Sequence, residues 1–297
     1  MFGKSQESGY SEMASRFRNK GAKFGGADGG GAGVELKPQS SPLNGRLWGA
    51  RARDWADIQE RQTRPVFEAA LQRTGVGPGT RYLDVGCGAG VAAQLAAARG
   101  ARVCGVDAAE ALIAIARENT PGGEFQVGDL EALPFADAAF DVVAGFNAFQ
   151  YAANPVVALS EAGRVTKAGG WIVVTVWSPP DGVPAAAMIR ALGPLLPPPP
   201  PGAPGPFALS DEATLRAFVA DAGLAPVEVF DVPCQWEYPD EATAIRGFNA
   251  AGVATRAMEH SGEAAVTEAH RQALAPFHQS DGRYKIGASF RCLLARP

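Results

Sequence analysis

The sequence predicts an α/β fold with a doubly wound, mostly parallel sheet. An apolar, β-rich run at residues 82–85 leads through a glycine turn into an alanine-rich helical pattern at residues 91–99. Three more predicted strands, each ending in polar residues, are 101–107, 124–127 and 140–147. Because open parallel sheets bind ligands at the carboxyl ends of their strands, this edge is the predicted binding site.

The glycine turn has the spacing Gly-x-Gly-x-Gly from Gly86 to Gly90, and Asp84 precedes it. The dinucleotide fingerprint, Gly-x-Gly-x-x-Gly, would need a glycine at position 91, where this chain has Val91. A carboxylate inside the turn would repel a pyrophosphate but suits an ammonium group. The turn therefore favours a ligand with an amino-acid end, such as S-adenosylmethionine. Asp107, 23 residues after Asp84, could accept both hydroxyls of a ribose.

Over roughly residues 48–177 the chain resembles the Rossmann-like S-adenosylmethionine-dependent methyltransferases, and among them the ubiquinone and menaquinone biosynthesis C-methyltransferases (methyltransferase type 11). Besides the glycine turn and the spaced acids, the resemblance rests on the run 133–141 and on Gly169-Gly170 before a strand. Ala168 departs from the group, which usually has proline there. The resemblance implies seven strands in the order 3-2-1-4-5-7-6, with the last antiparallel, and S-adenosyl-L-methionine as cofactor.

The resemblance also implies roles for individual residues. The expected cofactor-binding residues are Asp84, Gly86, Cys87, Gly88 and Gly90 for the methionine end, Asp107 and Ala108 for the ribose, Gly128, Asp129 and Leu130 beside the adenine, and Phe146 and Asn147 near the methyl group. The expected substrate-contacting residues are Phe149, Gln150, Trp48 and Trp55.

Before the core at residues 75–177, two segments differ in composition. Residues 1–45 are rich in glycine and serine and are predicted to be a disordered tail. Residues 46–74 predict one or two amphipathic helices that cover the cofactor as a lid. Trp48 and Trp55 would either close this lid or only pack its helices on the domain, with equal weight.

After the core, a proline-rich insertion at residues 178–209 is assigned to a substrate cap, with a protein-docking segment as the alternative. Residues 210–297 complete the sheet and contain a helical cap insertion at 239–276. The elements expected in these parts are helices at 155–165, 188–192 and 211–222 and strands at 171–177, 226–232 and 288–295.

Catalytic residues are harder to assign, because methyl transfer needs mainly alignment, and a base only where a proton must leave. A lone histidine is more often a surface or packing residue, which applies to His260 and His270. His278 is the preferred histidine because it lies in a turn before the last strand, and Glu161 is the second candidate base. Gln150, like Asn147, could orient an acceptor but cannot serve as a strong base.

The segment Asn147-Ala148-Phe149-Gln150 lacks the Asn/Asp-Pro-Pro-aromatic run that is typical of amino-methylating nucleic-acid enzymes. An apolar floor and a large cap favour C- or O-methylation of a hydrophobic or aromatic small molecule. Two alternatives are a protein of the same fold that binds the cofactor but catalyses cyclisation or decarboxylation, and a proline-rich docking module.

Composition further limits the partners and the location that we expect for the protein. The 297 residues are 46% hydrophobic with a net charge of −4, which argues against nucleic acid as the main partner. Four cysteines show no metal-ligand spacing, and no run of about 18 apolar residues could span a membrane. We therefore expect a cytoplasmic monomer or homodimer without a metal site.

Overall fold

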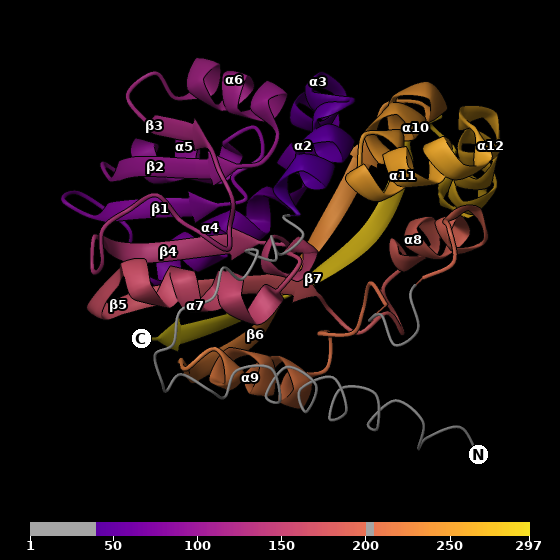
Figure 1. The fold of residues 1–297 in the computed structure, drawn as a ribbon. Coiled ribbons are helices and arrows are strands. Elements are labelled where there is room, and N and C mark those ends of the chain that lie inside the picture. The colour runs from indigo at the N-terminus through magenta and orange to yellow at the C-terminus, as the bar shows by residue number, and fades with distance from the viewer. Residues whose placement is uncertain (1–39, 200–204) are drawn as a thin grey trace, which may run out of the picture.

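In the computed structural model, which describes residues 40–199 and 205–297, seven strands form one sheet in the order β3-β2-β1-β4-β5-β7-β6 (Figure 1). They are β1 (Arg81–Val85), β2 (Arg102–Asp107), β3 (Glu124–Val127), β4 (Phe140–Phe146), β5 (Thr166–Trp177), β6 (Ala225–Tyr238) and β7 (Tyr284–Arg296). Strands β1 to β5 are parallel to one another, and β7 is antiparallel to both β5 and β6. The predicted fold class and strand order are confirmed.

Helices cover both faces of the sheet. One face carries α4 (Arg64–Arg73), α5 (Val91–Ala98) and α6 (Glu110–Asn119), and the other carries α7 (Pro155–Val165) and α9 (Glu212–Asp221). The start of α7 follows from the sequence, because the Asn154 side chain accepts the Val157 N–H and Pro155 occupies the first turn. The helix α9 begins in the same way, with the Asp211 side chain accepting the Thr214 N–H.

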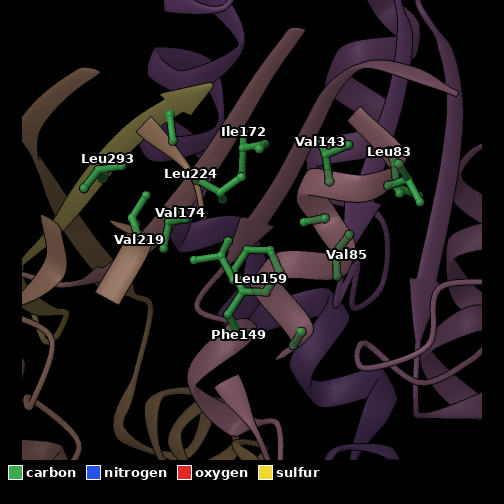
Figure 2. Packing of buried hydrophobic residues seen from close by; sticks show 14 of the residues in the cluster. Leu83, Val85, Val143, Phe149, Leu159, Ile172, Val174, Val219, Leu224 and Leu293 are labelled. Carbon is green, nitrogen blue, oxygen red and sulfur yellow. The ribbon is translucent and has the colours of Figure 1, made fainter. Parts of the chain in front are cut away.

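The largest buried cluster lies between the sheet and helices α7 and α9. Figure 2 shows its strand residues, such as Leu83 and Val143, facing Leu159 of α7. Phe149, from the short 3₁₀ helix η3 (Phe149–Tyr151) after β4, is part of the same cluster and is only 1% exposed. This core fixes β1 and β4 side by side, so that their carboxyl ends lie next to each other.

The last two strands are longer than predicted. Their pairing continues to Tyr238 opposite Tyr284, whereas β7 pairs with β5 only as far as Phe290 opposite Trp177. The outer halves of β6 and β7 therefore form a two-stranded ribbon that leaves the sheet and leads to the cap helices (Figure 1). The sequence analysis ended the strand at residue 232, directly before Pro233. A proline is nevertheless tolerated in an edge strand such as β6.

The cap consists of α8 (Ala186–Leu192) with the 3₁₀ turn η4 (Gly193–Leu195), and of α10 (Glu241–Asn249), α11 (Gly252–Ser261) and α12 (Glu263–Leu274), followed by η5 (Ala275–Phe277). Helix α12 packs on α8, α10 and α11. None of the helices in the described residues is both long and apolar enough to cross a membrane.

The N-terminal segment begins as α2 (Ser41–Gly49), five residues before the range given to the lid helices. It continues through α3 (Ala52–Asp54), a π-helical segment η1 (Trp55–Gln59) and a 3₁₀ segment η2 (Glu60–Thr63) into α4. The predicted tail at residues 1–39 and the proline run at residues 200–201 lie outside the described residues. Single π-helical turns often occur at functional sites, and this one directly precedes Glu60.

Candidate active site

One cavity lies at the carboxyl ends of β1, β2 and β4 and is closed by the N-terminal helices and the cap. Its lining includes both Trp48 and Trp55, whose rings meet edge to face with centroids 4.8 Å apart. The two tryptophans therefore lie where the sequence placed the lid. The ends of β1, β2 and β4 and the N-terminal helices line one side of the cavity, and the cap and strands β5, β6 and β7 line the other.

The glycine turn after β1 brings the backbone directly to the cavity. Gly86 has φ 70°, and a Cβ there would lie 2.6 Å from the Cβ of Ala148. Gly88 has φ 55°, and its Cβ would lie 2.7 Å from Glu60 Oε2. Since L-residues rarely adopt this conformation and neither position has room for a side chain, both need glycine. A ligand can therefore lie close against this backbone.

Two acids predicted from the sequence line the side of the cavity beside the glycine turn. Asp107 accepts the Gly88 N–H through Oδ2 at 2.9 Å and the Ala109 N–H through Oδ1 at 2.8 Å. Each carboxylate oxygen keeps a free lone pair, which could accept a hydroxyl of a ribose. Asp84 is 1% exposed, and its Oδ2 has no hydrogen-bond partner among the described residues. Burial raises the pKa of both carboxyls above the usual range.

A third acid, Glu60, comes from the N-terminal helices and was not expected. Its Oε2 accepts the Ala89 N–H at 2.7 Å, and its Oε1 accepts the Val91 N–H at 3.0 Å, at the start of α5. The side chain is only 5% exposed. Burial raises the pKa of Glu60 to about 7, against the lowering effect of these backbone hydrogen bonds.

The charged and polar residues that line the cavity fit S-adenosylmethionine. No Arg or Lys is among the cavity-lining residues in the described part of the chain, whereas Glu60, Asp84 and Asp107 all line it. The unpartnered Asp84 oxygen and this excess of acid suit a ligand that brings positive charge. Asp107 lies at the end of β2, where an acid can accept ribose hydroxyls.

The side of the cavity away from the glycine turn is apolar and aromatic. Its lining includes Met188, Leu192 and Phe248 from the cap and Trp177, Trp236 and Phe290 from β5, β6 and β7. His270 from α12 also lines it, is 1% exposed and shares a 2.8 Å hydrogen bond between its Nδ1 and Asn249 Oδ1. The sequence analysis preferred His278, whereas the structure places His270 at the cavity.

Most of the predicted binding residues meet at the cavity. Those that line it are Asp84, Gly86, Cys87, Gly88, Asp107, Ala108, Asp129, Leu130, Phe146, Asn147, Trp48 and Trp55. Asn147 has φ 51°, a left-handed conformation that asparagine tolerates better than most residues, and it turns the chain after β4. Their contact with a ligand stays a prediction.

Four other predicted residues lie outside the cavity lining. Gly90 precedes α5, where its Cβ would lie 3.0 Å from the Cβ of Ala116, so it serves helix packing. Gly128 packs on Val106 of β2 in the same way. Phe149 points into the core below the sheet, and the Gln150 side chain donates to Asn147 Oδ1 at 3.1 Å.

The two candidate bases also lie elsewhere. His278 is exposed beside Tyr284, with ring centroids 5.1 Å apart. Glu161 binds Arg164 through both oxygens at 2.7 Å and accepts the Leu133 N–H at 2.9 Å. The hydrogen bonds from Arg164 lower the pKa of Glu161, which opposes a role as a proton acceptor. Neither side chain is among the residues that line the cavity, and their roles as bases stay predictions.

We expect Glu161→Gln to leave the rate of methyl transfer within about twofold of the wild type, because the side chain touches no part of the cavity. The change should lower the free energy of unfolding by about 1 to 3 kcal/mol, since it weakens a charge-assisted, partly buried pair. Turnover and urea denaturation measure the two effects. A loss of turnover without a loss of stability would restore Glu161 as a base.

Comparison with known proteins agrees with this geometry. The methyltransferase domain family matches residues 83–174. The chain is 29% identical over 236 residues to a malonyl-[acyl-carrier protein] O-methyltransferase of Erwinia pyrifoliae, covering 80% of this chain and 85% of that protein. It is 36% identical over 119 residues to a demethylmenaquinone methyltransferase of Renibacterium salmoninarum, covering 40% of this chain and 50% of that protein.

Among solved structures, the [4+2]-cyclase SpnF has the same fold, with a TM-score of 0.55 and 20% identity over 87% of this chain and 97% of that one. The family match, the similarity to curated methyltransferases and the strand order together support a Rossmann-like S-adenosylmethionine-dependent methyltransferase domain that includes residues 83–174.

Proposed function

We propose that the enzyme transfers the methyl group of S-adenosylmethionine to carbon or oxygen of an uncharged hydrophobic or aromatic small molecule. The observation that carries the proposal is the composition of the cavity. It passes from four acids, which are Glu60, Asp84, Asp107 and Asp129, into an aromatic side formed by the cap and by β5, β6 and β7. Pockets of this kind hold apolar ligands by burial and orient them with few polar groups.

The charges of the cavity disfavour anionic acceptors. A carboxylate or phosphate there would lose its hydration without gaining an Arg or Lys partner among the described lining residues. It would also be repelled by Glu60, Asp84 and Asp107. Of the two curated relatives, one is named for a malonyl group, which carries a carboxylate, and the other for an uncharged quinone. The cavity therefore supports an acceptor of the second kind.

His270 supplies a polar group on the apolar side. Because Asn249 donates through its amide nitrogen to Thr267 Oγ1 at 3.0 Å, its Oδ1 is left to accept the Nδ1 proton of His270. The His270 Nε2 is then a hydrogen-bond acceptor, and it has no partner among the described residues. Burial lowers the pKa of His270 to about 4, so the ring is neutral at pH 7. It can orient an acceptor hydroxyl.

In this arrangement the bound cofactor supplies an electrophilic methyl group, and the chain supplies alignment. The glycine turn and Asp107 hold the cofactor at the sheet edge, while the aromatic side chains position the acceptor and exclude water. For transfer to oxygen, the hydroxyl proton would leave to solvent, because the lowered pKa of His270 opposes a role as a proton acceptor and limits it to orienting the hydroxyl. Asn147 lies at the end of β4 and could hydrogen-bond the acceptor.

The test is methyl transfer from labelled S-adenosylmethionine to matched acceptors, such as hydroquinones and naphthols against naphthoic acids of the same ring system. We expect uncharged acceptors to react at least about tenfold faster than carboxylic acids, since an unpaired buried charge costs several kcal/mol. Mass spectrometry of the products would show whether a methyl group was added and to which atom. Faster reaction of the carboxylic acids would contradict the proposed acceptor class. Conversion of an acceptor without a gain of methyl would favour a cyclase or decarboxylase.

A further inference from the structure

Glu60 lies at the junction of the N-terminal helices, the glycine turn and α5. Both of its carboxylate oxygens are hydrogen-bonded to the start of α5, through the Ala89 and Val91 N–H groups. Its Oε2 also lies where a Cβ on Gly88 would be, which places it directly over the turn. Each oxygen has a further lone pair, so these bonds do not exhaust what the carboxylate can accept.

The charges around Glu60 are all of one sign. The carboxyl groups that act on it from the packed elements are those of Asp84 in β1 and Asp107 in β2. The Cys87 thiol of the turn is also near, but burial raises its pKa well above the usual range, so it is neutral. The indole N–H of Trp55 in η1 also hydrogen-bonds it. No Arg or Lys among the described residues lines this cavity. The contributions that favour its negative charge are this indole N–H and the partial positive charge at the start of α5.

Such a site distinguishes the two forms of the cofactor by charge. S-adenosylmethionine carries an ammonium, a carboxylate and a sulfonium group and has a net charge of about +1. Methyl transfer removes the sulfonium charge and leaves S-adenosylhomocysteine with a net charge of about zero. Near the buried acids of this cavity, a change of one unit of ligand charge has a large electrostatic effect.

We propose, resting on the methyltransferase function above, that Glu60 is a cofactor-recognition residue whose negative charge makes the cavity bind S-adenosylmethionine more tightly than S-adenosylhomocysteine. Loss of the methyl group then weakens the attraction, so the product is released while fresh cofactor binds. Because Glu60 belongs to the N-terminal helices, the same contact couples their closure to the charge of the ligand.

The sign of the pH dependence follows from the ionisation of Glu60. Its pKa in the free protein is about 7, because burial and the nearby acids raise it. A bound cation favours the ionised form and lowers this pKa. Affinity for S-adenosylmethionine should therefore rise as the pH increases through 7, and about half a proton should be released on binding at pH 7.

The experiment is isothermal titration calorimetry of the full chain with each ligand between pH 6 and 8, in buffers of different ionisation enthalpy. We expect the wild type to prefer S-adenosylmethionine by about tenfold or more at pH 8 and less at pH 6. Glu60→Gln should lose most of this preference and the proton release at pH 7. Glu60→Asp, which keeps the charge, should retain both.

Glu68→Gln is the matched control, because Glu68 is an exposed glutamate on α4 that pairs with Arg64. It should behave as the wild type. Ionisation of the ligand itself is the same for every variant, so differences between proteins report on the side chain. Melting temperatures show whether Glu60→Gln remains folded.

Equal ligand preference and proton release in Glu60→Gln and the wild type would assign Glu60 to a purely structural bond with α5 and overturn the proposal. If Glu60→Gln does not fold, loss of the preference in Glu60→Asp would do the same. If the wild type binds neither ligand, the proposed function fails, and that outcome differs from loss of the preference alone.

Discussion

Phe149→Ala is expected to lower the free energy of unfolding by about 3–5 kcal/mol, the range for removing a buried aromatic side chain. The ring is 1% exposed and packs beside Leu159 in the cluster of Figure 2. It also lies against Gly145 of β4, where there is no room for a Cβ, so the surrounding backbone cannot easily collapse into the space. Urea denaturation followed by circular dichroism measures the loss.

A suitable control is Leu43→Ala, because Leu43 of α2 is 44% exposed. Its effect should stay within about 0.5 kcal/mol, as is usual for surface positions. The sequence analysis placed Phe149 at the substrate, and that role makes the opposite prediction. Unchanged stability with a raised KM for the acceptor would show that Phe149 lines the pocket after all.

Asp107→Ala is expected to weaken binding of S-adenosylmethionine by about tenfold or more, which corresponds to roughly 1.5–3 kcal/mol for hydrogen bonds to a charged group. In the proposed complex the carboxylate accepts both ribose hydroxyls. It also accepts the N–H groups of Gly88 and Ala109, so the change removes a support of the glycine turn as well. Calorimetry with the cofactor and with adenosine measures the loss.

The matched control is Asp141→Ala, since Asp141 lies at the opposite end of the sheet. It accepts the Arg81 N–H at 2.8 Å and pairs with Lys167 at 2.6 Å. That change should affect stability and leave cofactor affinity unchanged. If Asp107→Ala loses affinity for the cofactor but not for adenosine, the carboxylate does not contact the ribose.

The sheet edge could be predicted because its signals are local. A strand, a glycine turn and a helix follow one another within residues 81–98, and the positive φ angles of the glycines are requirements that only this residue type meets. Asp84 and Asp107 follow from the same pattern, because parallel neighbours must end at one edge. The sequence therefore contains most of the proposed cofactor half.

Side-chain direction beyond the strands could not be predicted. Phe146 and Phe149 are three residues apart, yet the left-handed turn at Asn147 and the 3₁₀ helix η3 send one to the cavity and the other to the core. Glu60 resembles an ordinary charge on a helix surface. Only the π-helical segment before it and the packing of the lid on α5 bring it to the turn. The position of His270 likewise depends on how α12 packs against the other cap helices.

The ribbon of β6 and β7 has a consequence for how acceptor specificity can change. The helices α10, α11 and α12 are inserted between Tyr238 and Tyr284, which face each other as paired residues of neighbouring strands. The two ends of this 45-residue insertion are therefore about 5 Å apart. A segment with such close ends can be exchanged for another helical segment, or shortened to a hairpin turn, without altering the register of the sheet. Such an exchange would replace cavity-lining residues of α10 and α12, such as Phe248 and His270, and leave unchanged the strands that lead to the glycine turn and Asp107.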